Sequence, residues 1–128
     1  MSPGKAPALF YRKVYAVVRQ IPAGQVTSYG RVADMIGHPG ASRQVGYAMS
    51  ALRNWGDNPE FRGIPWQRVV GHDGRIVIKG GEQSRHYQAE LLREEGVDVG
   101  DDLQVDMGEY LWEGLLPHEA QALLEGLE

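Results

Sequence analysis

The segment Ile64-Pro65-Trp66-Gln67-Arg68-Val69 contains side chains that are well suited to binding a ligand. The indole of Trp66 offers a flat apolar surface, and the planar guanidinium of Arg68 can hold the loop through hydrogen bonds to carbonyl groups or to an acid. The 128 residues include no cysteine, which excludes a thiol nucleophile, a thiolate metal site and a disulfide. We therefore expect this segment to bind noncovalently and not to catalyse a reaction.

Three helices are predicted before this segment. Apolar residues near helical spacing predict a core-packing helix that ends at Ile21-Pro22-Ala23-Gly24. Ser28 can cap a helix over residues 29–36, and after a turn at Pro39-Gly40 another helix is expected over residues 42–53. Two short helices joined by a tight Gly/Pro turn are typical of a helix-turn-helix. The buried face of the second of them is expected to contain Val45, Met49 and Leu52.

A small wing and a further helix are predicted after the segment. Short β-prone runs at residues 68–70 and 75–78 flank the turn sequence His72-Asp73-Gly74, a pattern typical of a β-hairpin. A helix is then expected over residues 82–95, with Gly96 as its C-cap. The inward face of this helix is expected to contain Tyr87, Leu91 and Leu92.

These elements predict an α+β fold that is mainly α: a winged helix-turn-helix DNA-binding domain with a small β-hairpin wing. We assign this domain to residues 1–112, and an acidic C-terminal extension with a short helix from Pro117 to residues 113–128. Residues 1–89 carry 12 Lys and Arg against 5 Asp and Glu, whereas residues 90–128 carry 1 against 12. This acidic part is compatible with a solubilising role, with partner docking and with limiting nonspecific adhesion to DNA.

Other classes of protein are disfavoured by the sequence. No apolar run approaches the roughly 20 residues needed to cross a bilayer, and the N-terminus lacks the pattern of a signal peptide. None of the four histidines pairs with another at metal-ligand spacing. We expect a cytoplasmic monomer without cofactor or metal.

Five motifs in order resemble those of the O6-alkylguanine-DNA alkyltransferases. The active-site signature of these enzymes is Ile-Pro-Cys-His-Arg-Val, and residues 64–69 resemble it with Trp66 in place of the cysteine nucleophile and Gln67 in place of the histidine. This replacement is the hallmark of the alkyltransferase-like proteins, which lack the alkyl acceptor, and the chain resembles that family from about Phe10 to Trp112. The motifs are Thr27-Ser28-Tyr29-Gly30, Ala41-Ser42-Arg43-Gln44-Val45-Gly46, residues 64–69, Gly80-Gly81 and Glu94-Glu95-Gly96.

The resemblance implies a DNA-binding surface on the helix-turn-helix. In the family, the tyrosine that matches Tyr29 presses on the target phosphate and helps to rotate the nucleotide out, and the arginine that matches Arg43 replaces the extruded base. Tyr29 could instead pack on the core, Arg43 could be an ordinary phosphate contact, and Tyr47 could widen the surface or simply pack. Small or polar neighbours would let the helix approach the minor groove closely: Ala41, Ser42, Gln44 and Gly46.

The resemblance also implies a lesion pocket lined by Tyr29, Trp66, Val69, Lys79 and Gly80. Trp66 would form an apolar wall for the alkyl group and the extruded base, and the carbonyl groups of Trp66 and Val69 could accept hydrogen bonds from the guanine amine. Lys79 lies where some relatives have an arginine that stacks on the base. A lysine could make a weaker cation–π contact, contact a phosphate or remain solvated.

The function implied by the resemblance is binding of O6-alkylguanine lesions in double-stranded DNA by nucleotide flipping without alkyl transfer. The complex would mark the lesion for nucleotide excision repair proteins. The main alternative is a winged-helix transcription regulator, although small residues on the exposed helix disfavour base-edge readout. A hydrolytic enzyme using Glu82, His86 or Tyr29 is another alternative, although no nucleophile and base occur at a convincing spacing.

Overall fold

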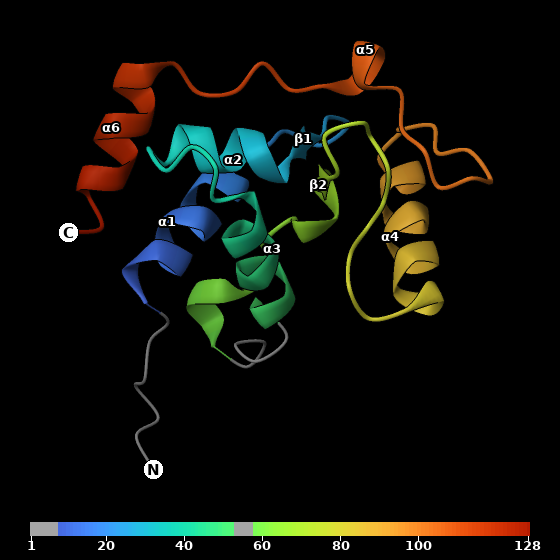
Figure 1. Ribbon diagram of the computed structural model, residues 1–128, viewed down its shortest axis with the longest axis horizontal. Coiled ribbons are helices and arrows are strands. Elements are labelled where there is room, and N and C mark those ends of the chain that lie inside the picture. Colours follow the sequence, from blue (N-terminus) through green and yellow to red (C-terminus); the bar gives the residue numbers. More distant parts are fainter. Residues whose placement is uncertain (1–7, 53–57) are drawn as a thin grey trace.

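A computed structural model describes residues 8–52 and 58–128, and six α-helices and two short strands form the fold over these residues (Figure 1). The strands β1 (Thr27–Ser28) and β2 (Val69–Val70) pair in parallel, with Thr27 opposite Val69 and Ser28 opposite Val70. Two 3-10 turns, η2 (Pro59–Phe61) and η3 (Trp66–Arg68), precede β2. The predicted mainly helical α+β class is confirmed. The α-helices are α1 (Leu9–Val18), α2 (Tyr29–Met35), α3 (Ser42–Ala51), α4 (Glu82–Glu94), α5 (Met107–Tyr110) and α6 (Pro117–Glu125).

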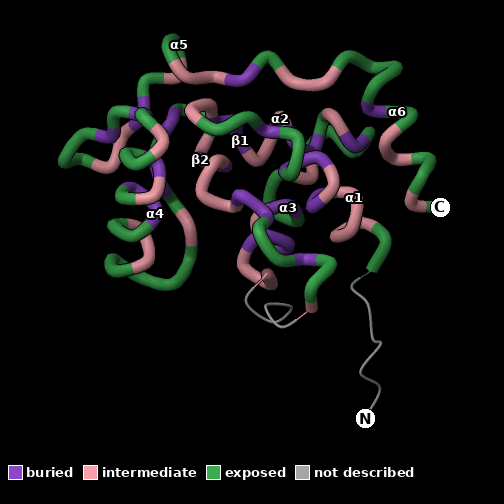
Figure 2. Tube along the Cα trace, turned by 180° about the vertical axis from the view of Figure 1, so that it is seen from behind, coloured by how far each residue is buried: buried purple, intermediate pink, exposed green. Residues whose placement is uncertain are grey.

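Helices α1, α2 and α3 pack together around the main hydrophobic core, and Figure 2 shows buried residues gathered where these helices meet. One face of α1 is buried because its apolar residues recur at helical spacing. The hydroxyl of the buried Tyr15 donates to the Ala48 carbonyl at 2.7 Å, which ties α1 to α3. The buried residues of α1 are Val14, Tyr15, Val17 and Val18.

The predicted helix-turn-helix consists of α2 and α3. Ser28 is the N-cap of α2, as predicted, and its hydroxyl oxygen accepts from the Arg31 backbone N–H at 3.2 Å. Val45 and Met49 are buried in α3, as predicted, and the described part of the helix ends at Ala51. The predicted end near Arg53 lies outside the described residues.

The predicted β-hairpin wing needs a correction. The turn at His72–Gly74 is present, and the Gly71 N–H donates to the Arg75 carbonyl at 2.8 Å. Beyond this bond the two arms separate, because β2 pairs with β1 and the Ile76 N–H donates to the Leu103 carbonyl at 3.0 Å. The segment after the turn is therefore held by the C-terminal part of the chain and not by β2.

Helix α4 follows the prediction in its extent but not in its buried face. Gly96, with a φ of +91°, ends the helix, and the Val97 N–H returns to the Leu92 carbonyl at 3.0 Å. Leu92 is buried as expected, whereas Tyr87 is exposed and Gln88 is fully buried in its place. The buried amide is stabilised by hydrogen bonds, since Gln88 Nε2 donates to the carbonyl groups of Gln67 and Val69, both at 3.0 Å.

The chain after α5 runs back across the molecule and places α6 beside α1 (Figure 1). The Val26 N–H donates to the Tyr110 carbonyl at 2.9 Å, and the Trp112 N–H donates to the Val26 carbonyl at 2.7 Å, so this segment is fixed next to β1. The division into residues 1–112 and 113–128 stays a prediction. Within residues 8–52 and 58–128, no helix is both long enough and apolar enough to cross a membrane.

Candidate nucleic-acid interface

Helix α3 turns one face to the core and the other to the surface. Val45, Ala48 and Met49 are buried, whereas Tyr47 is 43% exposed. Near the start of the helix Ser42, Arg43 and Gln44 are exposed, while Ala41, the N-cap residue, and Gly46 are half-buried. The helix therefore offers a surface of mostly small side chains with one long cation, as close approach to a DNA groove requires.

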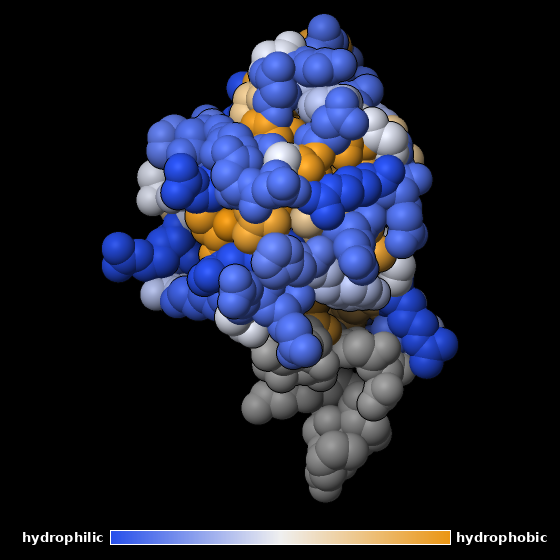
Figure 3. Space-filling view, turned by 90° about the vertical axis from the view of Figure 1, so that its right-hand side faces the viewer, coloured by the Kyte–Doolittle hydropathy of each residue, from blue (hydrophilic) through white to orange (hydrophobic). Residues whose placement is uncertain are grey.

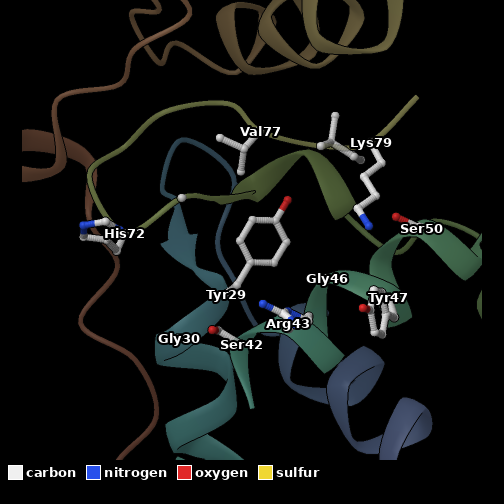
Figure 4. A pocket seen from close by; sticks show the side chains of 12 residues that line it. Tyr29, Gly30, Ser42, Arg43, Gly46, Tyr47, Ser50, His72, Val77 and Lys79 are labelled. Atoms are coloured by element: carbon white, nitrogen blue, oxygen red, sulfur yellow. The ribbon is translucent and has the colours of Figure 1, made fainter. Parts of the chain in front are cut away.

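The exposed face of α3 borders a cavity of about 800 Å³, which we call the α3 groove. Figure 4 shows Tyr29 standing among side chains from α3 and from the segment that carries Val77 and Lys79. The groove thus joins α2, α3 and the segment after β2, which are distant in sequence. Its lining residues are Tyr29, Gly30, Ser42, Arg43, Gly46, Tyr47, Ser50, Gly71, His72, Val77, Ile78 and Lys79.

Tyr29 is the first residue of α2 and packs partly against the core while lining the α3 groove. Burial raises the pKa of its hydroxyl to about 12, because the phenolate would lose solvation. The hydroxyl therefore stays protonated at neutral pH and can donate a hydrogen bond to a phosphate oxygen. Packing and DNA contact, considered as alternatives from the sequence, are compatible in this position.

Trp66 lines a second cavity of about 500 Å³, which we call the indole pocket. The indole is half-buried: it packs against the main core and also lines this pocket. Ser50, Ile78 and Lys79 line both cavities, and the indole pocket therefore adjoins the α3 groove. The other lining residues are Met49, Leu52, Phe61, Arg62, Gly63, Ile64, Ser84 and Tyr87.

Lys79 lies between the two cavities. Its Nζ atom is 5.1 Å from the centre of the Tyr47 ring, a cation–π contact that links the segment after β2 to α3. Figure 4 shows the lysine chain extending from that segment toward Tyr47 and Ser50. Lys79 therefore lies where the two cavities adjoin.

Two of the predicted pocket residues lie elsewhere. The Val69 side chain is buried in the core, and its carbonyl already accepts the hydrogen bond from Gln88. Gly80 lines neither cavity, and its carbonyl accepts from the Ser84 hydroxyl at 3.2 Å. Tyr29 belongs to the α3 groove and Trp66 to the indole pocket, so Lys79 is the predicted residue that borders both. The roles of these residues in DNA binding stay predictions.

Several lining residues were not predicted from the sequence to belong to the site. His72 and Val77 line the α3 groove, and Arg62 and Tyr87 line the indole pocket. None of them belongs to a motif, and only the three-dimensional arrangement brings them to the site. Within the described parts of the chain, no three His, Cys, Asp or Glu side chains are placed to hold a metal ion.

A network around Glu95 holds the loop that carries Trp66. The Arg68 guanidinium donates through Nε and Nη2 to the Glu95 carboxylate, with the shortest contact at 2.8 Å, and through Nη1 to the Ile21 carbonyl at 2.7 Å. Gln67 Nε2 donates to the same carboxylate at 2.8 Å. The Arg68 and Glu95 side chains are only 16% and 15% exposed, so solvent screens this pair weakly. The expected structural role of Arg68 is confirmed.

The ionisation of Glu95 follows from this network. Burial would raise its pKa, but hydrogen bonds from Arg68, Gln67 and the Gly24 N–H, together with the charge of Arg68, outweigh burial and lower the pKa. The carboxylate is therefore charged at neutral pH. The Gln67 amide cannot act as a base in place of a histidine, because it does not take up a proton near neutral pH; it holds the Glu95 carboxylate.

Replacing Glu95 with Gln should lower the free energy of unfolding by about 1–2 kcal/mol near neutral pH, because Arg68 loses its counter-charge. Because the folded pKa is depressed, the carboxylate stabilises the fold above the unfolded pKa of about 4.3, and this contribution is lost as the pH falls through the folded pKa. Urea denaturation should therefore show the difference between wild type and Glu95→Gln narrowing at about pH 3.5. The exposed neighbour Glu94, changed to Gln, is the matched control. If wild type and Glu95→Gln differed in unfolding free energy equally near neutral pH and at about pH 3.5, the role of the charge would be contradicted.

A helix-turn-helix with a groove on its exposed helix and an adjoining aromatic pocket defines a DNA-binding domain that can accept a base. Residues 9–97 match the family described as 6-O-methylguanine DNA methyltransferase, DNA binding domain. The chain belongs to this family, as an alkyltransferase-like member that has no cysteine to accept an alkyl group.

Similar proteins include a base-flipping protein and an alkyltransferase-like protein. A DNA base-flipping protein of Vibrio parahaemolyticus is 36% identical over 104 residues, which cover 81% of this chain and 96% of that protein. Alkyltransferase-like protein 1 of Schizosaccharomyces pombe is 42% identical over 104 residues, which cover 79% of this chain and 85% of that protein.

Solved structures agree with these relatives. The crystal structure of S. pombe Atl1 in complex with damaged DNA containing O6-carboxymethylguanine has a TM-score of 0.72 at 34% identity, covering 85% of this chain and 99% of that one. The Mycobacterium tuberculosis OGT in complex with DNA has a TM-score of 0.56 at 37% identity, covering 70% of this chain and 51% of that one. The predicted family is therefore confirmed.

Proposed function

We propose that the protein binds O6-alkylguanine lesions in duplex DNA by flipping the damaged nucleotide, without transferring the alkyl group. The observation that carries this proposal is the position of Trp66. It occupies the place of the cysteine in the alkyltransferase signature and lines a pocket that adjoins the groove of the DNA-binding helix. An indole there can bind an alkyl group but cannot accept it covalently. The relatives named as base-flipping and alkyltransferase-like proteins support the same function.

Noncovalent recognition is energetically feasible with these side chains. Extruding a base costs a few kcal/mol, and less where pairing is already weakened, as at an alkylated guanine. Stacking on an aromatic side chain returns roughly 1–3 kcal/mol per base. Trp66 in the pocket and Arg43 in the vacated stack together offset extrusion. Burying one methyl group adds only about 0.8 kcal/mol, so weakened pairing contributes much of the discrimination against normal guanine.

The test is a titration with duplexes that differ only at one guanine, followed by mass spectrometry of the DNA. We expect tighter binding to the O6-methylguanine duplex than to the unmodified one, and the methyl group should remain on the DNA after stoichiometric incubation. Equal affinity for the two duplexes would contradict lesion recognition. Recovery of demethylated guanine would contradict binding without chemistry.

We also propose that the protein acts as a monomer and that its complex with DNA marks the lesion for nucleotide excision repair proteins. A long-lived complex without turnover is useful only if another activity completes repair. Purified excision nuclease should therefore incise an O6-methylguanine duplex faster when the protein is present than when it is absent. Unchanged or slower incision would contradict this coupling, while leaving lesion binding intact.

A further inference from the structure

Tyr87 lies beside Trp66 although the two residues belong to α4 and η3. The centres of their rings are 6.1 Å apart, and the ring planes meet at 38°. Trp66 is half-buried against the core, whereas Tyr87 is 56% exposed. The two rings therefore form one continuous surface, which we call the aromatic wall, that extends from the interior of the indole pocket to its rim.

The exposure of Tyr87 gives this wall a free end. On the face of the molecule that carries α4, at the right of Figure 1, hydrophobic side chains reach the surface between hydrophilic ones (Figure 3). A tyrosine that is more than half exposed gains little from burial in the fold, but it offers a rigid apolar plane to a ligand. The apolar side chains of Met49 and Phe61 line the same pocket, so a ligand held against the wall also contacts core residues.

The geometry points to Tyr87 as a specificity-determining residue that gives the site a preference for guanines whose O6 substituent carries an aromatic ring. This inference rests on the proposed function and names the class of lesion that the same site prefers. A methyl carbon is bonded directly to O6, so with the base on Trp66 it contacts little beyond the indole. A benzyl ring extends farther and can cover Trp66 and Tyr87 together, in the offset or tilted arrangements that aromatic rings favour.

The inference can be tested by competition titration with three duplexes, which contain guanine, O6-methylguanine or O6-benzylguanine at one position. Wild type should bind the benzylated duplex more tightly than the methylated one. Tyr87→Leu should lower the affinity for the benzylated duplex about 3- to 10-fold, the range expected for loss of one aromatic contact, and change the affinity for the methylated duplex less than about twofold. Tyr87→Phe should retain most of the preference, because the ring is kept.

His86→Ala is the matched control, because His86 is the exposed neighbour of Tyr87 on α4 and does not line the indole pocket. It should leave all three affinities unchanged. Thermal unfolding of each variant checks that the fold is intact. If Tyr87→Leu lost affinity equally for the methylated and benzylated duplexes, or lost none for either, the role of Tyr87 would be overturned. A lesion preference in wild type would still support the proposed function in that case. Absence of any lesion preference in wild type would contradict both.

Discussion

Trp66→Ala should lower the affinity for a duplex containing O6-methylguanine about 10- to 100-fold, since aromatic stacking contributes roughly 1–3 kcal/mol per base. The affinity for unmodified duplex should fall less than about threefold, because the α3 groove keeps its side chains and normal DNA need not enter the indole pocket. The ratio of the two affinities therefore falls toward one. Fluorescence anisotropy with both duplexes measures this ratio directly.

A second substitution separates stacking from packing. Trp66 is half-buried against the core, so removing it also affects stability. Trp66→Leu keeps apolar volume at this position and should preserve more of the fold, yet it should lose most of the lesion preference because it lacks a flat ring. If Trp66→Leu kept the full preference, or if both variants weakened binding equally on damaged and undamaged DNA, the indole would have no role in recognising the base.

The parts of the fold that depend on neighbouring residues could be predicted from the sequence. The Ser28 cap needs only the N–H group of Arg31, and the buried faces of α1 and α3 follow from helical spacing. The hairpin was predicted incorrectly because an Asp-Gly turn signal concerns only adjacent residues. The strand partner of residues 69–70 is β1, far earlier in the chain, and the partner of Ile76 is Leu103.

The buried face of α4 shows a different limit. Hydrophobic spacing predicts that Tyr87 faces inward and that a glutamine faces solvent. Gln88 is buried instead because two backbone carbonyl groups near η3 need a donor, and its amide provides one for each. Because α4 turns Gln88 toward the core, Tyr87 lies beside Trp66. A polar residue in the core thus determines which aromatic side chain reaches the pocket.

Motifs indicate some of the residues that line the two cavities, but they do not show how these residues are arranged. The motifs indicate Tyr29, Arg43 and Trp66. They do not show that Tyr29 and Arg43 line one cavity and Trp66 lines another. Nor do they show that Lys79 contacts Tyr47 between the two cavities. Such contacts join segments that are distant in the chain, so they depend on the packing of α3 against the loop after β2.

Arg43→Ala should reduce the fraction of everted base, and it should lower the affinity for damaged duplex about tenfold or more. Both effects are expected because the vacated stack would be left unfilled. A fluorescent base analogue placed beside the lesion reports eversion, and its signal should rise less with the variant than with wild type. Arg43 is exposed at the start of α3 and lines the α3 groove, so its loss should leave the fold intact.

Salt dependence distinguishes this role from a simple phosphate contact. Loss of one phosphate contact would make the fall of log K with log salt less steep, by about 0.9 in slope. It would also weaken binding equally on all duplexes. Loss of an intercalated side chain should instead weaken binding mainly to damaged DNA. Arg43→Lys keeps the charge but not the planar guanidinium, and should therefore also lose eversion. Gln121→Ala, at an exposed position of α6 that lines neither cavity, should change neither quantity. If Arg43→Ala everted the base to the same extent as wild type, the arginine would act only as a charge.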